Sequence, residues 1–407
     1  MIDPAPPNAE APAAPPERGG PRTGGLGEIA RVFAKLGVIA FGGPAAHIAM
    51  MEEEFVVRRK WIGRQHFLDL IGATNLVPGP NSTEMTMHVG YERGGPRGLF
   101  VAGACFIGPA VLLTGIAAWA YVAFGSLPAV ERFLYGIKPA VLAIILGALW
   151  RLGKKAVTGW RLAVLAAAVT ALVLAGTGEV WALLAGGAVG AVWLKASQPS
   201  SGSAGRVLPL LLLQGGAAGA VAGGAAAISL PKLFWFFLKV GSVLYGSGYV
   251  LVAFLEGGLV DDLGWLTQGQ LLDAIAIGQF TPGPVLSTST FIGYVVGAAG
   301  GVGPVAGAAV ATLGIFLPSF LFVWALNPLV PRLRESAWLS AALDAVNAAA
   351  VALMVAVTIE LGLDVLVSWP AIVIALAAAV AVLRFGASAV WVVVGGAVAG
   401  WLLAPWA

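Results

Sequence analysis

Long apolar runs alternate with short polar or charged connectors along almost the whole chain. Most runs are close to the length of about 20 residues that an α-helix needs to cross a bilayer. The pattern therefore predicts an all-α polytopic membrane protein with about 11 to 13 spans. The runs lie near residues 29–51, 66–91, 98–124, 133–150, 161–176, 179–194, 207–230, 232–255, 270–296, 302–326, 337–358, 365–383 and 388–405.

Two of these runs are interrupted by a Pro-Gly-Pro sequence, at Pro78-Gly79-Pro80 and at Pro282-Gly283-Pro284. Proline lacks an amide donor and disfavours the α region for the preceding residue, so neither run can be one continuous helix. Backbone broken at membrane depth must be buried in protein or line a wet cavity. The breaks are therefore candidate binding sites, and the alternative is a surface turn between two short helices.

An internal repeat relates the two breaks. Shifting residues 33–86 by 204 positions aligns them with residues 237–290 without a gap. A shared spacing of Lys, Glu, Trp, Asp and Pro-Gly-Pro is not explained by an alanine-rich and leucine-rich composition. The shift matches Phe33 with Phe237, Lys35 with Lys239, Gly37 with Gly241, Gly42 with Gly246, Glu52 with Glu256, Trp61 with Trp265 and Asp69 with Asp273. We predict two homologous repeats, each with a Pro-Gly-Pro-broken helix.

The predicted domain organisation follows from this repeat. Residues 1–25, rich in Pro, Ala and Gly, are expected to be a disordered tail, because they lack the apolar core of a signal peptide. We assign residues 26–196 to an N-terminal repeat, 197–230 to a linker and connecting helix, and 231–407 to a C-terminal repeat.

The orientation of the repeats depends on how the broken segments cross. If each Pro-Gly-Pro segment crosses once, the count is about 13 spans and the repeats are inverted; if each is a re-entrant hairpin, it is about 11 and they are parallel. The loop Lys and Arg residues favour the first arrangement, with the N-terminus inside. In that arrangement the basic connector at Arg58–Arg64 lies on the opposite side from most other loop cations.

Composition narrows the class of protein further. The chain is 59% hydrophobic and 11% charged, whereas soluble domains carry about 25% charge. Its net charge of +3 comes from cations dispersed between apolar runs, which favours a membrane surface and not nucleic acid as the partner. Cys105 is the only cysteine, so an intrachain disulfide is excluded. Common hydrolase, P-loop and zinc-protease motifs are missing, so we expect no enzyme and no cofactor.

The helix that restarts after each break is the first candidate for binding an anion. A helix N-terminus presents free amides and the positive end of its dipole. The first restart carries Asn81-Ser82-Thr83, the second carries Ser287 and Thr288, and the aligned amides Asn75 and Gln279 precede the breaks. Capping and interhelical hydrogen bonds are the alternative role for these side chains.

Ionisable residues within apolar runs are the second group of candidates. Lys35 and Lys239 are matched in the two repeats and could neutralise a dianion, with snorkelling to the membrane surface as the alternative. Glu84 and His88 lie one turn apart and could bind and release a proton, with a structural hydrogen bond as the alternative. We expect His47 and His66 to be structural, and Asp69 and Asp273 to cap the N-termini of their helices.

These motifs resemble the chromate ion transporter (CHR) family, in its long two-domain form. The resemblance covers about residues 28–405 and rests on Phe41-Gly42-Gly43-Pro44, the connector from Glu52 to Trp61, Val77-Pro78-Gly79-Pro80-Asn81-Ser82-Thr83-Glu84 and Gly278-Gln279-Phe280-Thr281-Pro282-Gly283-Pro284. The second copy of the first motif departs from the pattern and reads Tyr245-Gly246-Ser247-Gly248.

The resemblance implies a multi-pass plasma-membrane exporter that removes chromate from the cytoplasm and confers chromate resistance, with sulfate as a similar dianion. A homo-oligomer is left open, because the sequence does not reveal the oligomeric state. The residues alone leave open a transporter of another anion, such as sulfate or molybdate. They also leave open a membrane scaffold or a lipid-handling enzyme. The coupling ion and the direction of transport are not predicted from the sequence.

Overall fold

The computed structural model describes residues 25–41, 43–74, 77–196, 227–245, 248–326 and 337–403. Within these residues every regular element is a helix, which confirms the prediction of an all-α polytopic membrane protein. Four helices, α4, α5, α12 and α14, are long and apolar enough to cross a membrane. Residues 1–24 of the predicted tail and nearly all of the predicted linker and connecting helix lie outside the described residues, as do Gly42, Asn75, Leu76, Gly246 and Ser247.

The helices fall into two series with matching order. The first is α1 (Leu26–Ile39), α2 (Pro44–Glu52), η1 (Glu53–Arg58), α3 (Arg64–Thr74), α4 (Asn81–Phe124), α5 (Pro128–Ala156), α6 (Trp160–Leu174) and α7 (Glu179–Ala196). The second is α8 (Leu230–Val243), η2 (Gly248–Val250), α9 (Leu251–Leu255), η3 (Glu256–Asp262), α10 (Gln268–Phe280), η4 (Val285–Ser287), α11 (Thr288–Ala299), α12 (Pro304–Leu326), α14 (Ala337–Val365), α15 (Trp369–Phe385) and α16 (Ala389–Leu403).

The structural repeat extends far beyond the aligned 33–86 segment. Helices α1 and α8 both have 14 residues and start 204 positions apart. Helices α5 and α14 both have 29 residues and start 209 positions apart, and α6 and α15 keep that offset with a Trp at each start. The five-residue change in offset falls between the breaks and α5. It explains why a gapless alignment ends soon after the second Pro-Gly-Pro.

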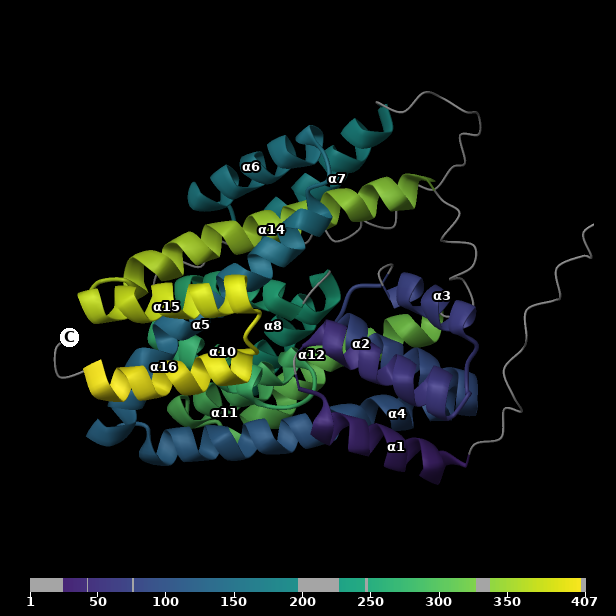
Figure 1. The fold of residues 1–407 in the computed structure, drawn as a ribbon, viewed down its shortest axis with the longest axis horizontal. Coiled ribbons are helices and arrows are strands. Elements are labelled where there is room, and N and C mark those ends of the chain that lie inside the picture. Colours follow the sequence, from purple (N-terminus) through teal and green to yellow (C-terminus); the bar gives the residue numbers. More distant parts are fainter. Residues whose placement is uncertain are drawn as a thin grey trace, which may run out of the picture.

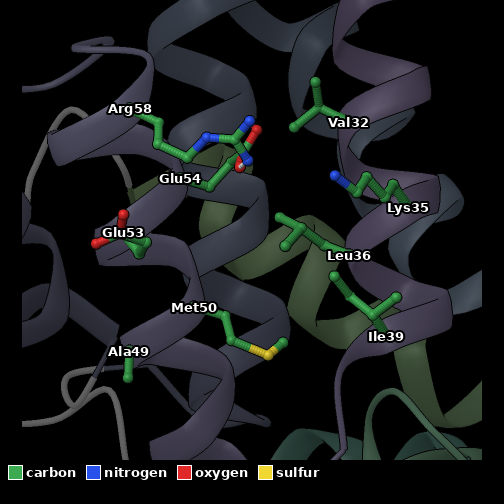
Figure 2. A pocket seen from close by; sticks show the side chains of 9 residues that line it. All are labelled: Val32, Lys35, Leu36, Ile39, Ala49, Met50, Glu53, Glu54 and Arg58. Atoms are coloured by element: carbon green, nitrogen blue, oxygen red, sulfur yellow. Dashed lines mark hydrogen bonds and ion pairs between the residues drawn. The ribbon is translucent and has the colours of Figure 1, made fainter.

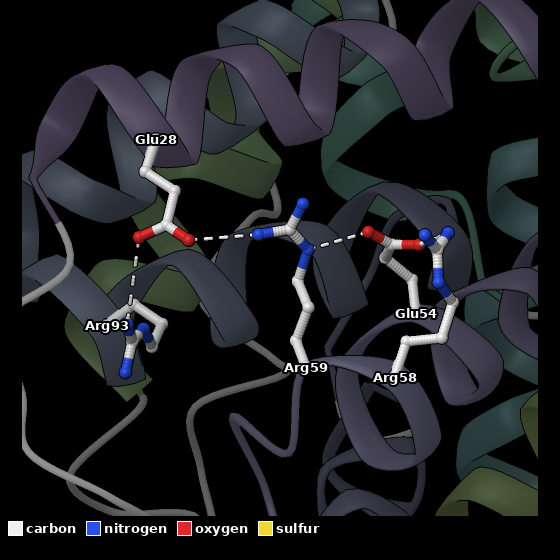
Figure 3. Close-up of polar contacts among 5 residues, drawn as sticks. All are labelled: Glu28, Glu54, Arg58, Arg59 and Arg93. Atoms are coloured by element: carbon white, nitrogen blue, oxygen red, sulfur yellow. Dashed lines mark hydrogen bonds and ion pairs between the residues drawn. The ribbon is translucent and has the colours of Figure 1, made fainter.

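Each repeat begins with two helical hairpins. Helices α1 and α2 run antiparallel, so that Glu28 near the start of α1 pairs with Arg59 beyond η1 at 2.9 Å (Figure 3). The second hairpin consists of α3 and the first part of α4, because His66 Nε2 at the start of α3 lies 3.5 Å from Glu92 Oε1. The Pro-Gly-Pro break is the tip of this second hairpin.

Short helix length makes these hairpins re-entrant. Helix α1 has 14 residues, which is about 21 Å at 1.5 Å per residue and less than the hydrocarbon thickness of about 30 Å. After the second hairpin the chain reverses at Gly95, whose φ is 61°, and the backbones of Gly90 and Gly98 pack directly together. The preference from loop charge for a single crossing by the Pro-Gly-Pro segment is therefore corrected: the segment enters and leaves on one side.

The repeats are nevertheless inverted, as predicted. The part of α4 after Gly95 joins the two hairpin bases, because Arg93, just before that reversal, reaches Glu28, and Tyr121 near the end of α4 donates to Asp273 of α10 at 2.9 Å. The equivalent helices α5 and α14 pack antiparallel, with Gly153 against Val351 and Gly362 against Leu142. Because equivalent elements point in opposite directions, the axis that relates the repeats lies in the membrane plane.

Re-entry combined with inversion explains the position of the basic connector Arg58–Arg64, which the sequence analysis had placed on the opposite side from most other loop cations. The first hairpin returns Arg58–Arg64 to the end of the molecule from which α1 started, next to Arg93. The parallel arrangement expected for re-entrant segments is wrong, because the equivalent helices α5 and α14 pack antiparallel.

The final helices of each repeat cover the other repeat. Helices α6 and α7 pack on α14, and α15 and α16 pack on α5, as Figure 1 shows at the top and left of the molecule. Small residues allow the close approach, since Gly136 of α5 touches the backbone of Gly396 and Gly400 of α16. The two repeats therefore form one interleaved body.

An ionic network ties the hairpin bases of the first repeat together (Figure 3). Glu54 accepts from Arg58 at 2.9 Å and from Arg59 at 2.6 Å, and Arg59 and Arg93 both reach Glu28. The hydrogen bond from Arg59 is the main reason that the pKa of Glu54 lies below its usual value of 4.5.

This network predicts a defined acid sensitivity. A depressed carboxyl pKa stabilises the fold above the ordinary value of 4.5, and that contribution is lost as pH falls through the lower folded-state pKa. Glu54→Gln should lower the thermal unfolding midpoint at pH 7 and make it fall less steeply below pH 4.5 than in the wild type. Asp69→Asn, at a half-buried position of α3, is the control. Identical pH profiles for Glu54→Gln and the wild type would contradict the assignment.

Candidate functional site

The two Pro-Gly-Pro breaks are buried, and each bonds to the opposite repeat. The Gly79 amide donates to the Leu244 carbonyl at 2.7 Å, and the Gly283 amide donates to the Ala40 carbonyl at 2.8 Å. Ala40 and Leu244 end α1 and α8, and they are related by the same shift of 204 as the two glycines. The broken backbone is thus satisfied by a reciprocal exchange between repeats, which excludes the alternative of an exposed surface turn.

Only glycine fits at these two positions. Gly79 has a φ of 146° and Gly283 a φ of 98°, values that side-chain-bearing residues rarely adopt. A methyl group on Gly79 would overlap the carboxylate of Glu84 and the hydroxyl of Ser319. A methyl group on Gly283 would lie 2.7 Å from the methyl of Ala110. The region where Gly79 and Gly283 lie, hereafter the centre, is therefore densely packed. The first break faces polar groups there.

Unsatisfied polar atoms gather around the first break. Ser82, Thr83 and Glu84 open the restarted α4, and all three are buried. The Thr83 hydroxyl, both Glu84 oxygens and the Ser319 hydroxyl have no hydrogen-bond partner among the described residues. Tyr245, which follows the carbonyl that Gly79 bonds, is within electrostatic reach of Glu84. Buried polar atoms are costly without partners, so this cluster is suited to an additional polar occupant.

His47 connects the two breaks, a role that the sequence did not predict. Its Nε2 lies 3.0 Å from the Ala40 carbonyl, the same oxygen that accepts from Gly283. Its Nδ1 lies 3.2 Å from the Ser82 hydroxyl. Because a carbonyl only accepts, Nε2 donates, and in the neutral ring Nδ1 accepts from Ser82. Repeat comparison would not have found this residue, since Leu251 occupies the matched position.

The second break has less available polar chemistry. The hydroxyl of Thr288 donates to the Val285 carbonyl at 2.8 Å, and the hydroxyl of Ser287 accepts from Thr114 at 3.3 Å. These bonds fit the alternative of helix capping and interhelical bonding. Gln279 accepts from Tyr249 at 3.3 Å, while its side-chain nitrogen has no partner among the described residues. The positions matched to Ser82 and Glu84 are Leu286 and Thr288, so the centre is asymmetric.

The predicted lysines lie away from this centre. Lys35 is exposed in a groove of about 370 Å³ between α1 and α2, which Glu53, Glu54 and Arg58 also line (Figure 2). Lys239 is exposed, with its ammonium 5.8 Å from the ring centre of Phe236. The structure therefore brings Glu84, Ser82, Thr83 and the two Pro-Gly-Pro breaks together but places both lysines at the periphery.

The remaining predicted residues are placed as follows. His88 is buried in α4 one turn after Glu84, and Asn81 is the first residue of that helix. Asp273 accepts from Tyr121, while Thr267 and Gln270 cap α10, so the prediction that Asp273 caps its helix is wrong. The prediction placed the helix start too late: α10 begins at Gln268, which puts Asp273 in its second turn.

Comparison with known proteins identifies the family. The chromate transporter family model matches residues 27–191 and 231–401, one stretch in each repeat. The chain belongs to the chromate transporter family. It is 32% identical over 394 residues to a chromate transport protein of Pseudomonas aeruginosa, covering 92% of this chain and 91% of the relative. It is 30% identical over 364 residues to a chromate transport protein of Cupriavidus metallidurans, covering 88% of each.

A third relative is a probable chromate transport protein of Synechococcus elongatus, 29% identical over 371 residues, covering 89% of this chain and 91% of the relative. No solved structure matches the chain. Membership in this family implies a transporter rather than an enzyme, and with the apolar helices it indicates a multi-pass protein of the plasma membrane.

The packing around Gly79 leads to a direct test. Gly79→Ala should destabilise the protein by about 2 kcal/mol or more, because it combines backbone strain with overlap at Glu84 and Ser319. Gly108→Ala is the matched control, since Gly108 in α4 has open space around it. Thermal unfolding in lipid nanodiscs measures both. Equal midpoints for the two variants would show that the first break is not packed as described.

Proposed function

We propose that this protein exports chromate from the cytoplasm, and that the anion passes the point where the two Pro-Gly-Pro breaks meet. The observation that carries the proposal is the reciprocal bonding of Gly79 to Leu244 and of Gly283 to Ala40, which brings both buried breaks together beside the unpartnered hydroxyls of Thr83 and Ser319 at the first break. The names of the relatives as chromate transport proteins support chromate as the substrate. Export by such a protein would confer chromate resistance.

A tetrahedral dianion has only acceptors, so its site must supply donors. Thr83 on α4 and Ser319 on α12 carry unpartnered hydroxyls around the first break, and the Ser82 hydroxyl would join them by exchanging its bond to His47 for one to the anion. The anion would lie near the start of α4, where the helix dipole also favours negative charge. Gln279 could add an amide donor from the second break, where Ser287 and Thr288 are mostly committed to other bonds. Asn75 and Asn81 remain part of the proposed first half of the site.

Glu84 is the residue that would couple anion binding to proton binding. An ionised carboxylate beside a dianion is repelled, so anion binding favours the protonated form of Glu84. The protonated carboxyl would donate a hydrogen bond to the anion, and release of the anion would return the proton. His88, one turn along the same helix, is the proposed exchange partner of Glu84.

The positions of the cations indicate which side of the protein faces the cytoplasm. Lysine and arginine of the described residues gather at the hairpin base of the first repeat and at the helix ends on that side. They are Arg58, Arg59, Lys60, Arg64, Arg93, Arg97, Arg151, Lys154, Lys155, Arg161, Lys195 and Arg384. By the positive-inside rule this side faces the cytoplasm. Lys35 then lies at a basic cytoplasmic mouth that attracts anions, and Lys239 lies at the opposite mouth.

Ser82→Ala and Glu84→Gln test the proposal in inside-out vesicles loaded by chromate uptake. Loss of one hydrogen bond to a charged ligand costs about 1.5–3 kcal/mol, so Ser82→Ala should raise the KM for chromate about 10-fold or more. Glu84→Gln should retain chromate binding and lose the pH dependence of transport. Ser242→Ala removes a hydroxyl that bonds only within α8 and is the control.

Wild-type kinetics in Ser82→Ala would remove the first break from the pathway. Competition by sulfate and molybdate in the same vesicles decides the alternative substrates, because the proposed donors also fit those anions. Stronger transport of sulfate than of chromate would overturn the substrate assignment while leaving the site intact.

A further inference from the structure

A cluster of carboxylates lies at the hairpin base of the second repeat. Glu256 begins η3 and is 2% exposed. Its Oε1 accepts from Gln268 of α10 at 2.8 Å, and its Oε2 has no partner among the described residues. The carboxylate of Glu179, at the start of α7, lies directly against Gly257. Four elements thus converge on a buried acid that lacks a full set of hydrogen bonds, with Glu360 of α14 as the fourth contributor.

At the matched location of the first repeat a half-buried carboxylate faces a cation. Glu52 is the residue matched to Glu256, and Arg64 is matched to Gln268. Arg64 Nε lies 3.5 Å from Glu52 Oε1, so an ion pair stands where the second repeat has a neutral amide. The positions matched to Asp262 and Glu360 are Arg58 and Arg151. The same structural location is therefore basic in one repeat and acidic in the other.

The surroundings of Glu256 disfavour its ionised form from almost every side. Glu179 of α7, Glu360 of α14 and Asp261 of the same connector act on it as like charges, and Gln268 of α10 opposes them. Lys239 of α8 acts on the neighbouring Glu179. Burial is the largest effect and raises the pKa of Glu256 to about 8, with the like charges adding to it. The group accordingly holds a proton at neutral pH.

We propose that Glu256 is a proton-binding site of the outer mouth, and that it takes up and releases one proton in each transport cycle. The proton adds to the unpartnered Oε2 from bulk water and returns to bulk water when the ionised form is stabilised. Asp261 and Asp262, in the same connector, line its route to solvent. This inference rests on the proposed transport function, and it adds a proton site at the acidic outer mouth to the Glu84 and His88 pair proposed beside the anion.

An infrared titration tests the site without any transport measurement. Wild-type protein in nanodiscs should show a carboxylic-acid carbonyl band that disappears on raising the pH through about 8. Glu256→Gln should remove that band. In Gln268→Arg the band should disappear at a lower pH, with at least a tenfold higher proton concentration at the midpoint. The reason is that the new cation reproduces the arrangement of Arg64 beside Glu52. Glu52→Gln is the matched control and should leave the band unchanged. A band that survives in Glu256→Gln overturns the assignment.

Vesicle transport tests the role in the cycle. With chromate as the probe, Glu256→Gln and Gln268→Arg should both lose the dependence of transport on an imposed pH gradient, while the KM for chromate at a fixed pH changes less than twofold. If transport in both variants still depended on the pH gradient as in the wild type, Glu256 would have no role in the transport cycle, and the proposal would be refuted. If the wild type does not transport chromate, the proposed function fails, and the infrared titration still decides whether Glu256 binds a proton.

Discussion

The constraint on which this structure depends is that broken backbone in a membrane must find hydrogen-bond partners within the protein. The Pro-Gly-Pro segments create two such breaks, and in each the glycine amide finds its acceptor in the other repeat. Gly79 bonds to the end of α8 and Gly283 to the end of α1. This exchange requires the repeats to meet tip to tip, and the crossing of α6 and α7 onto α14, and of α15 and α16 onto α5, holds them there.

The backbone is symmetric, but its side chains are not. His47, Ser82 and Glu84 surround the first break, and the matched residues of the second are Leu251, Leu286 and Thr288. At the hairpin bases the pair Glu52 and Arg64 is matched by Glu256 and Gln268. The proposed export in one direction would need different chemistry on the two sides of the membrane. The divergence between the repeats would provide that difference.

Much of the fold could be predicted from the sequence because helix length, Pro-Gly-Pro breaks and repeated residues are local signals. Re-entry could not, because an apolar run such as 29–51 has the same length whether it crosses once or folds into α1 and α2. The glycines and proline at residues 42–44 were the available signal for the turn.

The positions of the candidate residues in the fold were predicted in part. Ser82, Thr83 and Glu84 follow the first break in sequence and meet the second repeat in space. Lys35 and Lys239 were placed too centrally, because their depth was judged from distance along a helix and not from which face of α1 or α8 they occupy. His47 was missed because its partners, Ala40 and Ser82, become neighbours only when α2 folds back on α1.

The most direct test of the central claim is an electron cryo-microscopy structure of the protein in nanodiscs with chromate. The account predicts anion density beside Gly79, within hydrogen-bond distance of the Ser82 and Thr83 hydroxyls, with the Gly79–Leu244 and Gly283–Ala40 bonds in place. Density confined to the Lys35 groove, or breaks that do not contact the opposite repeat, would contradict it.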